Sequence, residues 1–305
     1  MELDADLARV IDAVPAWAGL GAEVEVLGGG ITNRNFRVDI GGESFVVRLA
    51  GKDTELLGVD REAERAATEA AAAAGVAPEV YAYLPEHRAL ITRFVEADPL
   101  PPEDLERPEV MGAVIDAVRA IHGMAPIPSS FDVFRVVRAY RRTAGSRGVR
   151  IPEVYGEALS IADRAAEAFA ASPTPRRPCH DDLLNANFLM REGRVVIVDY
   201  EYAGMGDPFF DLGNLSINNQ ISEAAQEVLL ERYFGTPTRV HRARLALMRV
   251  LSDFREAMWG VLQQAISSLD FDYVDYADRH FVRCLEGAAD ARFGTWLEEA
   301  RGEPW

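Results

Sequence analysis

The motif that decides the fold of this chain reads Cys179-His180-Asp181-Asp182-Leu183-Leu184-Asn185-Ala186-Asn187-Phe188-Leu189. It contains a His-x-Asp triplet that ends at Asp182, and Asn187 follows five residues later. A second acidic cluster begins at Asp199, twelve residues after Asn187, directly behind four β-branched residues. An unbroken apolar run of this kind is typical of a buried strand, so we expect a rigid scaffold to hold Asp199 at the strand end.

These residue types meet the needs of phosphoryl transfer. The reaction uses a carboxylate that accepts the proton of the attacking hydroxyl, and oxygen ligands that hold Mg²⁺ against the phosphates of ATP. Asp182 suits the first role, and Asn187 and Asp199 suit the second. Taken singly, each could instead be a helix cap or a turn residue. The ordered set favours the functional interpretation, and we interpret His180 as a hydrogen-bonding brace of the loop.

The residues before this motif predict a small lobe rich in strands. We expect two hairpins and one capped helix, and we place the boundary of the lobe in the proline-rich segment 98–102. The expected strands cover residues 23–27, 35–40, 44–49, 80–84 and 89–95, and the expected helix runs from 60 to 75.

The rest of the chain is predicted to be mostly helical. Helices are expected around residues 110–121 and 154–171, and short strands near 180 and over 194–198 bracket the motif. The sequence therefore predicts an α+β fold with two lobes: a nucleotide-binding small lobe over residues 1–97, and a large lobe over 98–305 that carries catalysis and substrate binding.

Two further features of the small lobe suit nucleotide binding. A Gly-rich turn at residues 28–30 would let backbone amides approach phosphate oxygens, although such turns are common in hairpins. Arg48 on a strand and Glu64 on the following helix could supply a phosphate-binding cation and its brace. Kinases usually use a lysine as this cation, but Lys52, the single lysine of the chain, lies beyond the end of that strand. Arg48 is therefore the available substitute for the lysine. The alternative for Arg48 and Glu64 is an ordinary surface ion pair.

Composition narrows the partners of the protein. The net charge of −17 argues against nucleic acid and favours a cationic substrate, although acidity also simply maintains solubility. No apolar run is long enough to span a membrane. The acidic N-terminus does not resemble a secretory signal, and the two cysteines, Cys179 and Cys284, suit a reducing cytoplasm.

The chain resembles the choline/ethanolamine kinase family, especially its bacterial choline-kinase branch, and more distantly the aminoglycoside phosphotransferases. The resemblance covers residues 20–285 and is carried by segments 29–33, 46–49, 75–80, 91–96, 180–187, 199–202, 210–214 and 259–277. It implies a protein-kinase-like fold that binds ATP and Mg²⁺. The roles that it implies are a catalytic base at Asp182, Mg²⁺ ligands at Asn187 and Asp199 with help from Glu201, ATP phosphate contacts at Gly29, Gly30, Thr32, Asn33, Arg48 and Glu64, and backbone contacts to adenine at Phe94 and Val95.

The resemblance also implies a substrate site for a small cationic alcohol. Its aromatic residues match Tyr202, Trp259 and Tyr276, whose ring faces would hold a quaternary ammonium and favour the trimethylated cation. Asn218 stands where eukaryotic choline kinases have a glutamate, which removes a formal charge. A kinase of another small alcohol, such as ethanolamine, thiamine, homoserine or an aminoglycoside, therefore stays open, as does a catalytically silent nucleotide-binding module. Packing in a helical core is the alternative role of Trp259 and Tyr276.

Overall fold

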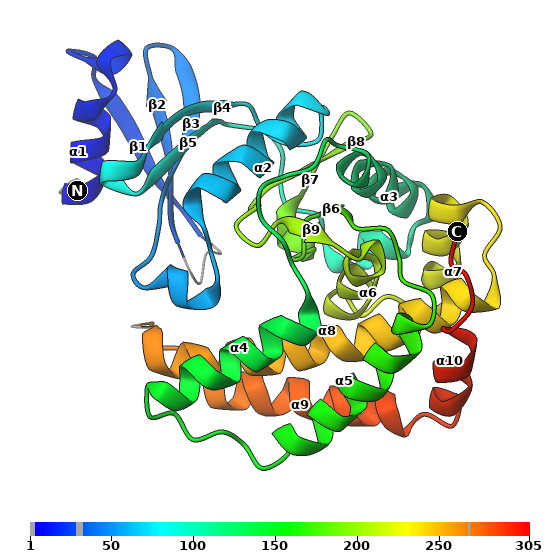
Figure 1. Cartoon of the computed structure of the whole chain (residues 1–305). Coiled ribbons are helices and arrows are strands. Elements are labelled where there is room, and N and C mark those ends of the chain that lie inside the picture. The colour runs from blue at the N-terminus through cyan, green and yellow to red at the C-terminus, as the bar shows by residue number, and fades with distance from the viewer. Residues whose placement is uncertain (1–3, 29–32, 268) are drawn as a thin grey trace.

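The structure is a computed structural model that describes residues 4–28, 33–267 and 269–305. Figure 1 shows a small lobe built around a twisted antiparallel sheet, and beside it a larger lobe made mostly of helices. The sheet has the strand order β1-β2-β3-β5-β4. Its strands are β1 Ala22–Leu27, β2 Arg34–Ile40, β3 Glu43–Leu49, β4 Val80–Leu84 and β5 Ala89–Arg93.

The hairpin of β2 and β3 forms as the sequence predicts. Side chains alternate between buried and half-buried along both strands, and the buried ones make one face of the sheet apolar. Gly41 and Gly42 at the turn have positive φ angles of 63° and 81°, which side chains other than glycine rarely allow. This apolar face forms a separate hydrophobic cluster that includes Phe45 and Val47.

A helix that the sequence analysis missed covers this face. Helix α1, Ala5–Ala13, contributes Leu7 and Val10 to the same cluster, and Figure 1 shows it against one side of the sheet. Asp4 caps the helix by accepting hydrogen bonds from the amides of Asp6 and Leu7. The expectation of a single helix in this lobe was therefore wrong.

Helix α2, Arg61–Ala73, begins behind Asp60, the residue predicted to cap it. Its buried alanines, Ala67 and Ala71, belong to the larger hydrophobic cluster, whose other members come mostly from the helical lobe. The helix therefore connects the sheet to the large lobe, and its first turn lies near the functional residues described below. The lobe boundary at residues 97 and 98 stays a prediction.

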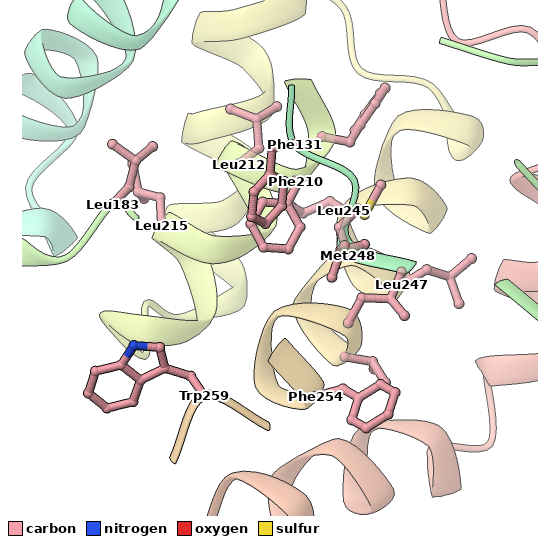
Figure 2. Packing of buried hydrophobic residues seen from close by; sticks show 14 of the residues in the cluster. Phe131, Leu183, Phe210, Leu212, Leu215, Leu245, Leu247, Met248, Phe254 and Trp259 are labelled. Atoms are coloured by element: carbon pink, nitrogen blue, oxygen red, sulfur yellow. The ribbon is translucent and has the colours of Figure 1, made fainter. Parts of the chain in front are cut away.

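The large lobe is built from long helices that pack around α8. Phe131 and Phe210 lie within its core with ring centroids 4.8 Å apart, and Figure 2 shows both beside Leu245 and Met248 of α8. No described helix is long and apolar enough to cross a membrane. The helices are α3 Pro108–His122, α4 Val133–Ser146, α5 Tyr155–Ala170, α6 Pro208–Asn218, α7 Glu223–Phe234, α8 Arg239–Ile266, α9 Tyr273–Ala289 and α10 Phe293–Glu299.

Two small antiparallel sheets, each of two strands, hold the motif of residues 179–189 between the lobes. Strand β6, Arg177–Cys179, pairs with β9, Gly204–Gly206, and strand β7, Phe188–Arg191, pairs with β8, Arg194–Ile197. The sequence predicted β6 and β8 but missed their partners, because β7 and β9 contain no β-branched residue to mark them as strands. The hairpin of β7 and β8 also contacts the chain entering the large lobe, since the amide of Leu100 donates to the carbonyl of Phe188 at 2.9 Å.

Candidate active site

The loop that carries Asp182 is braced by His180. The His180 side chain is fully buried, and its Nε2 lies 3.0 Å from the carbonyl oxygen of Val198. Its Nδ1 accepts a hydrogen bond from the amide of Asp182 at 3.3 Å. Nε2 therefore carries the ring proton, and burial lowers the pKa of His180, which keeps the ring neutral. This is the bracing role that the sequence indicated.

Helix α6 fixes the same loop from behind. The Asp211 carboxylate accepts hydrogen bonds from the amides of His180 and Asp181, at 2.9 and 2.7 Å. Asn214, one turn further on, accepts a hydrogen bond from the amide of Leu183 at 2.6 Å. His122 holds Asp211 in turn, with 2.9 Å between Nε2 and the carboxylate. The sequence analysis gave Asp211 no role, and its spacing from Asn214, three residues on one helix face, was the available sign.

The two predicted metal ligands lie at the same end of the hairpin of β7 and β8. Asn187 comes directly before β7, Asp199 lies two residues after β8, and the amide of Val198 donates to the carbonyl of Asn187 at 3.0 Å. The Nδ2 of Asn187 donates to the carbonyl of Asp182 at 3.0 Å, so the amide oxygen is the atom of this side chain that could bind a metal ion. Asp199 is held in a left-handed backbone conformation with φ 70°, which is unusual for a side chain other than glycine.

Arg48 of the small lobe reaches this metal-ligand pair. Its guanidinium forms ion pairs with Glu64 on α2 and with Asp199. The side chains of Arg48 and Glu64 are only 12% and 2% exposed, so the predicted pair forms but is not an ordinary surface pair. Its contact with ATP phosphates stays a prediction. Because Arg48 also contacts Asp199, the small lobe and the metal-ligand pair are physically connected.

Arg61 is a member of this network that the sequence analysis missed. Its Nη1 lies 2.7 Å from Glu64 Oε2 and 3.0 Å from Glu201 Oε2. Its Nη2 donates to Asn33 Oδ1 at 3.1 Å, and Asn33 itself donates to Glu201 at 2.9 Å. The spacing of Arg61 three residues before Glu64 was the available signal, since such residues meet on one helix face.

Glu201 is thus bound to residues of the small lobe, beside Asp199. Burial raises the pKa of its carboxyl, and the negative charge of Asp199 adds to that effect. A role in the metal shell stays a prediction. Phe94 and Val95 lie just beyond β5, where the amide of Phe94 donates to the carbonyl of Ser44 at 3.0 Å; their contact with adenine is likewise a prediction.

The predicted phosphate-loop residues Gly29, Gly30 and Thr32 lie outside the described residues.

The three predicted aromatic residues, Tyr202, Trp259 and Tyr276, come together and are called the aromatic cluster below. The indole Nε1 of Trp259 donates to the Tyr202 hydroxyl at 3.0 Å, and the rings of Trp259 and Tyr276 meet edge to face with centroids 5.5 Å apart. Trp259 is 7% exposed and packs at the edge of the core shown in Figure 2. Its packing role and a substrate role are therefore both compatible with its position.

Asn218, the fourth predicted substrate residue, is the last residue of α6. Its amide nitrogen is buried and has no hydrogen-bond partner within the described part of the chain. The neighbouring Asn219 is the residue that contacts the catalytic loop, because it accepts from the amide of Asn185 at 2.7 Å and donates to the carbonyl of Leu183 at 3.0 Å. A substrate role of Asn218 stays a prediction.

Two charged residues of α8, Arg255 and Glu256, lie between Asp182 and the aromatic cluster. Arg255 Nη1 is 3.2 Å from Asp182 Oδ1 and 2.5 Å from Glu256 Oε1. The Tyr276 hydroxyl donates to Glu256 Oε2 at 2.8 Å. The sequence analysis missed this pair, although adjacent charges inside the apolar stretch 250–262 were a visible signal, since buried charges need partners.

These neighbours set the proton affinity of Asp182. Burial raises the pKa of its carboxyl to about 7; the positive charge of Arg255 opposes this rise, and the negative charge of Glu256 adds to it. Asp199 and Glu201 also raise the pKa, so these carboxylates are close enough to interact. A carboxyl with a pKa near neutrality can accept and release a proton at physiological pH.

Comparison with known proteins agrees with this geometry. The family model described as "Phosphotransferase enzyme family" matches residues 23–247. A choline/ethanolamine kinase family protein from Mesorhizobium loti has a similar structure, with a TM-score of 0.85 and 33% identity, over 97% of this chain and 98% of that one. Mouse ethanolamine kinase 2 is 28% identical over 77% of this chain and 67% of its own length. Protein LicA of Haemophilus influenzae is 24% identical over 82% of this chain and 75% of its own length.

Structures with lower identity show the same fold. LicA of Streptococcus pneumoniae, described as a choline kinase, superposes with a TM-score of 0.79 at 22% identity over 93% of this chain and 99% of that one. The chain belongs to the phosphotransferase enzyme family, and within it to the choline/ethanolamine kinases and their relatives. It is an ATP-dependent small-molecule kinase with the α+β, protein-kinase-like fold that the sequence predicted, and the alternative of a catalytically silent module is set aside.

Proposed function

We propose that the protein transfers the terminal phosphoryl group of ATP to the hydroxyl of a small amino alcohol of the choline and ethanolamine type, with Mg²⁺ as the metal. The observation that carries this proposal is the position of Asp182. Its carboxylate lies beside Arg255, which also stacks over Tyr202 of the aromatic cluster. An alcohol whose ammonium end is held near these rings would therefore present its hydroxyl to Asp182.

Asp182 acts as the general base of the transfer. It accepts the hydroxyl proton as the alcohol oxygen attacks the terminal phosphorus, and the bond between that phosphorus and the β–γ bridging oxygen breaks, which releases ADP. The side chains of His180 and Asn187 hydrogen-bond to the backbone amide and carbonyl of Asp182, which fixes the position from which its carboxylate projects. Fixing the base in this way supports transfer, because phosphoryl transfer depends mainly on positioning and charge stabilisation.

Asn187 and Asp199 would hold Mg²⁺. The pair provides one amide oxygen and one carboxylate at the same end of a short hairpin, and these are oxygen ligands of the kind that Mg²⁺ prefers. When bound, the ion would neutralise negative charge on the phosphates. Arg48, braced by Glu64, supplies a further positive charge from the small lobe.

An ADP-release assay tests the proposal. The substrates to compare are choline, ethanolamine, thiamine, homoserine and an aminoglycoside, each with ATP and Mg²⁺ and with a control lacking the alcohol. We expect turnover of choline, ethanolamine or both, and loss of turnover when the Mg²⁺ is chelated. Turnover of the aminoglycoside alone would refute the substrate class and leave the kinase activity standing.

A further inference from the structure

One face of the Tyr202 ring, in the aromatic cluster, is already covered by a cationic side chain of the protein. The Arg255 guanidinium carbon lies 4.5 Å from the centroid of the Tyr202 ring. The Arg255 side chain is 2% exposed, so this stacking is buried. An aromatic face attracts one cation strongly when both are desolvated, and a second cation on the same face would meet the charge of the first. This face of Tyr202 is therefore poorly placed to hold a substrate ammonium.

The charges around Arg255 leave a carboxylate as the better partner for that ammonium. Arg255 forms ion pairs with two carboxylates, those of Asp182 and Glu256. The three side chains together have a net charge of −1 when both carboxylates are ionised. Glu256 uses one oxygen for Arg255 and the other for the Tyr276 hydroxyl. A carboxylate offers about four lone-pair sites, so Glu256 keeps capacity for another donor.

His280 and Asp253 are the next charged or titratable groups on this side of α8. His280 lies against Tyr276, with ring centroids 4.5 Å apart, and its Nδ1 is 2.8 Å from Asp253. Arg283 lies 3.1 Å from the same Asp253 carboxylate. These groups bond to one another, and Glu256 is the carboxylate that bonds to the aromatic cluster, through the Tyr276 hydroxyl.

Glu256 can accept a hydrogen bond from an ammonium that carries N–H groups, but not from a quaternary ammonium. A primary or secondary ammonium both attracts the carboxylate and donates a charge-assisted hydrogen bond to it. A trimethylated nitrogen has no N–H, is bulkier, and depends on free aromatic faces. Because Arg255 covers one face of the Tyr202 ring, a trimethylated cation has less aromatic surface to bind. An ammonium with N–H groups can still donate to the Glu256 carboxylate.

We propose that Arg255 and Glu256 make this site select amino alcohols whose ammonium carries N–H groups over quaternary ammonium alcohols. This inference rests on the proposed function and narrows it. It also reverses the expectation, drawn from the resemblance alone, that the trimethylated cation would be favoured. Arg255 and Glu256 are then specificity-determining residues, which lie beside the catalytic base without being the base.

A substrate series that differs only in N-methylation tests the proposal on the unmodified protein. The series is ethanolamine, N-methylethanolamine, N,N-dimethylethanolamine and choline, assayed for kcat/KM with saturating ATP and Mg²⁺ at neutral pH, where alkyl ammonium groups keep their proton. We expect kcat/KM to fall along the series, by about tenfold or more between ethanolamine and choline, the size expected for losing a hydrogen bond to a charged group. Equal or faster turnover of choline overturns this inference and leaves the proposed function intact. Turnover of none of the four overturns both.

Variants then assign the preference to the two residues. Glu256→Gln should lower kcat/KM for ethanolamine more than for choline, which narrows their ratio. Arg255→Ala should free the Tyr202 face and shift the ratio towards choline, even if both rates fall. The exposed residues Arg279 and Glu286 of α9 give matched controls, Arg279→Met and Glu286→Gln, which should leave the ratio unchanged. If both site variants are folded, as thermal unfolding verifies, and keep the unmodified protein's ratio of kcat/KM for ethanolamine to that for choline, the assignment of the preference to Arg255 and Glu256 is overturned.

Discussion

Asn33 of the small lobe donates a hydrogen bond to Glu201 of the large lobe, with 2.9 Å between Nδ2 and Oε2. The two residues are 168 positions apart in the chain, and both are buried. Arg61 contacts both of them, so one guanidinium and one amide join the lobes beside Asp199. A nucleotide bound by the small lobe would therefore be positioned through this contact against Asn187 and Asp199, the predicted metal ligands.

Removing that contact should weaken nucleotide binding. Asn33→Ala leaves Glu201 without one of its donors, and a hydrogen bond to a charged group contributes about 1.5–3 kcal/mol. We therefore expect the KM for ATP to rise by about tenfold or more, with a smaller effect on the KM for the alcohol. The double variant Asn33→Ala/Glu201→Gln should lose less than the sum of the single losses, because both changes break one contact. Additive losses would argue against coupling between the two residues.

Asp182→Ala should remove the general base. We expect kcat to fall by about 10²–10⁴-fold, the usual contribution of a positioned acid or base, with ATP affinity largely retained. Steady-state kinetics and a nucleotide-binding titration measure the two quantities separately. Asp278→Ala, an exposed change on α9, is the matched control and should keep full activity. An unchanged kcat in Asp182→Ala would show that another group accepts the proton.

Substitutions of Arg255 and Glu256 should shift the pH profile of kcat/KM in opposite directions. Burial raises the pKa of Asp182 to about 7, and the base works only when deprotonated, so kcat/KM should rise with pH through this region. The Glu256 charge adds to the rise in pKa, so Glu256→Gln should move the acid limb to lower pH. The Arg255 charge opposes it, so Arg255→Ala should move the limb to higher pH. Shifts of the same sign in both variants would contradict this assignment.

Two substitutions of Trp259 distinguish a packing role of this residue from a substrate-binding role. Truncation to Ala should cost about 3–5 kcal/mol of stability, because the side chain is buried. If Trp259 also holds the ammonium end, the KM for the alcohol should rise by the equivalent of about 1–2 kcal/mol. Trp259→Phe keeps most of the packing and loses the hydrogen bond to Tyr202, so it separates the two effects. A lower melting temperature with an unchanged KM in both variants would assign Trp259 to the core alone.

Asp211 should contribute stability that depends on acid pH. Burial would raise the pKa of its carboxyl, but the hydrogen bond and charge of His122, with smaller contributions from His180, bring the pKa below its ordinary value. The unfolded state therefore binds this proton at higher pH, so the contribution is full above about pH 4 and is lost as pH falls through the folded pKa. Asp211→Asn should lower the free energy of unfolding at pH 7.

The difference in unfolding free energy between Asp211→Asn and the unmodified chain should shrink as the solution is made more acidic. Denaturant unfolding at several pH values measures this difference. A difference that is constant with pH would show that the charge of Asp211 contributes nothing, and that only the shape of the side chain matters.

Much of the fold could be read from local patterns. Helix α2 and its cap Asp60 follow from a helical repeat behind a capping residue, and the hairpin of β2 and β3 follows from alternation around Gly41 and Gly42. Helix α1 was not predicted because its nine residues are too few to form a stable helix alone, and they gain their stability from the sheet that they cover. Strands β7 and β9 were not predicted because, unlike β8, they contain no β-branched residue that would favour a strand.

The sequence by itself determined the chemical groups of this protein: a carboxylate and two oxygen ligands at fixed spacing, with a strand arginine and a helix glutamate to accompany them. Only the tertiary structure decided which charges lie next to which. Arg255 and Asp182 are 73 positions apart, and no local pattern records that contact. The physical reason is that a pKa or a cation's partner depends on burial and distance in space, whereas motif spacing reports only the conformation of neighbouring residues.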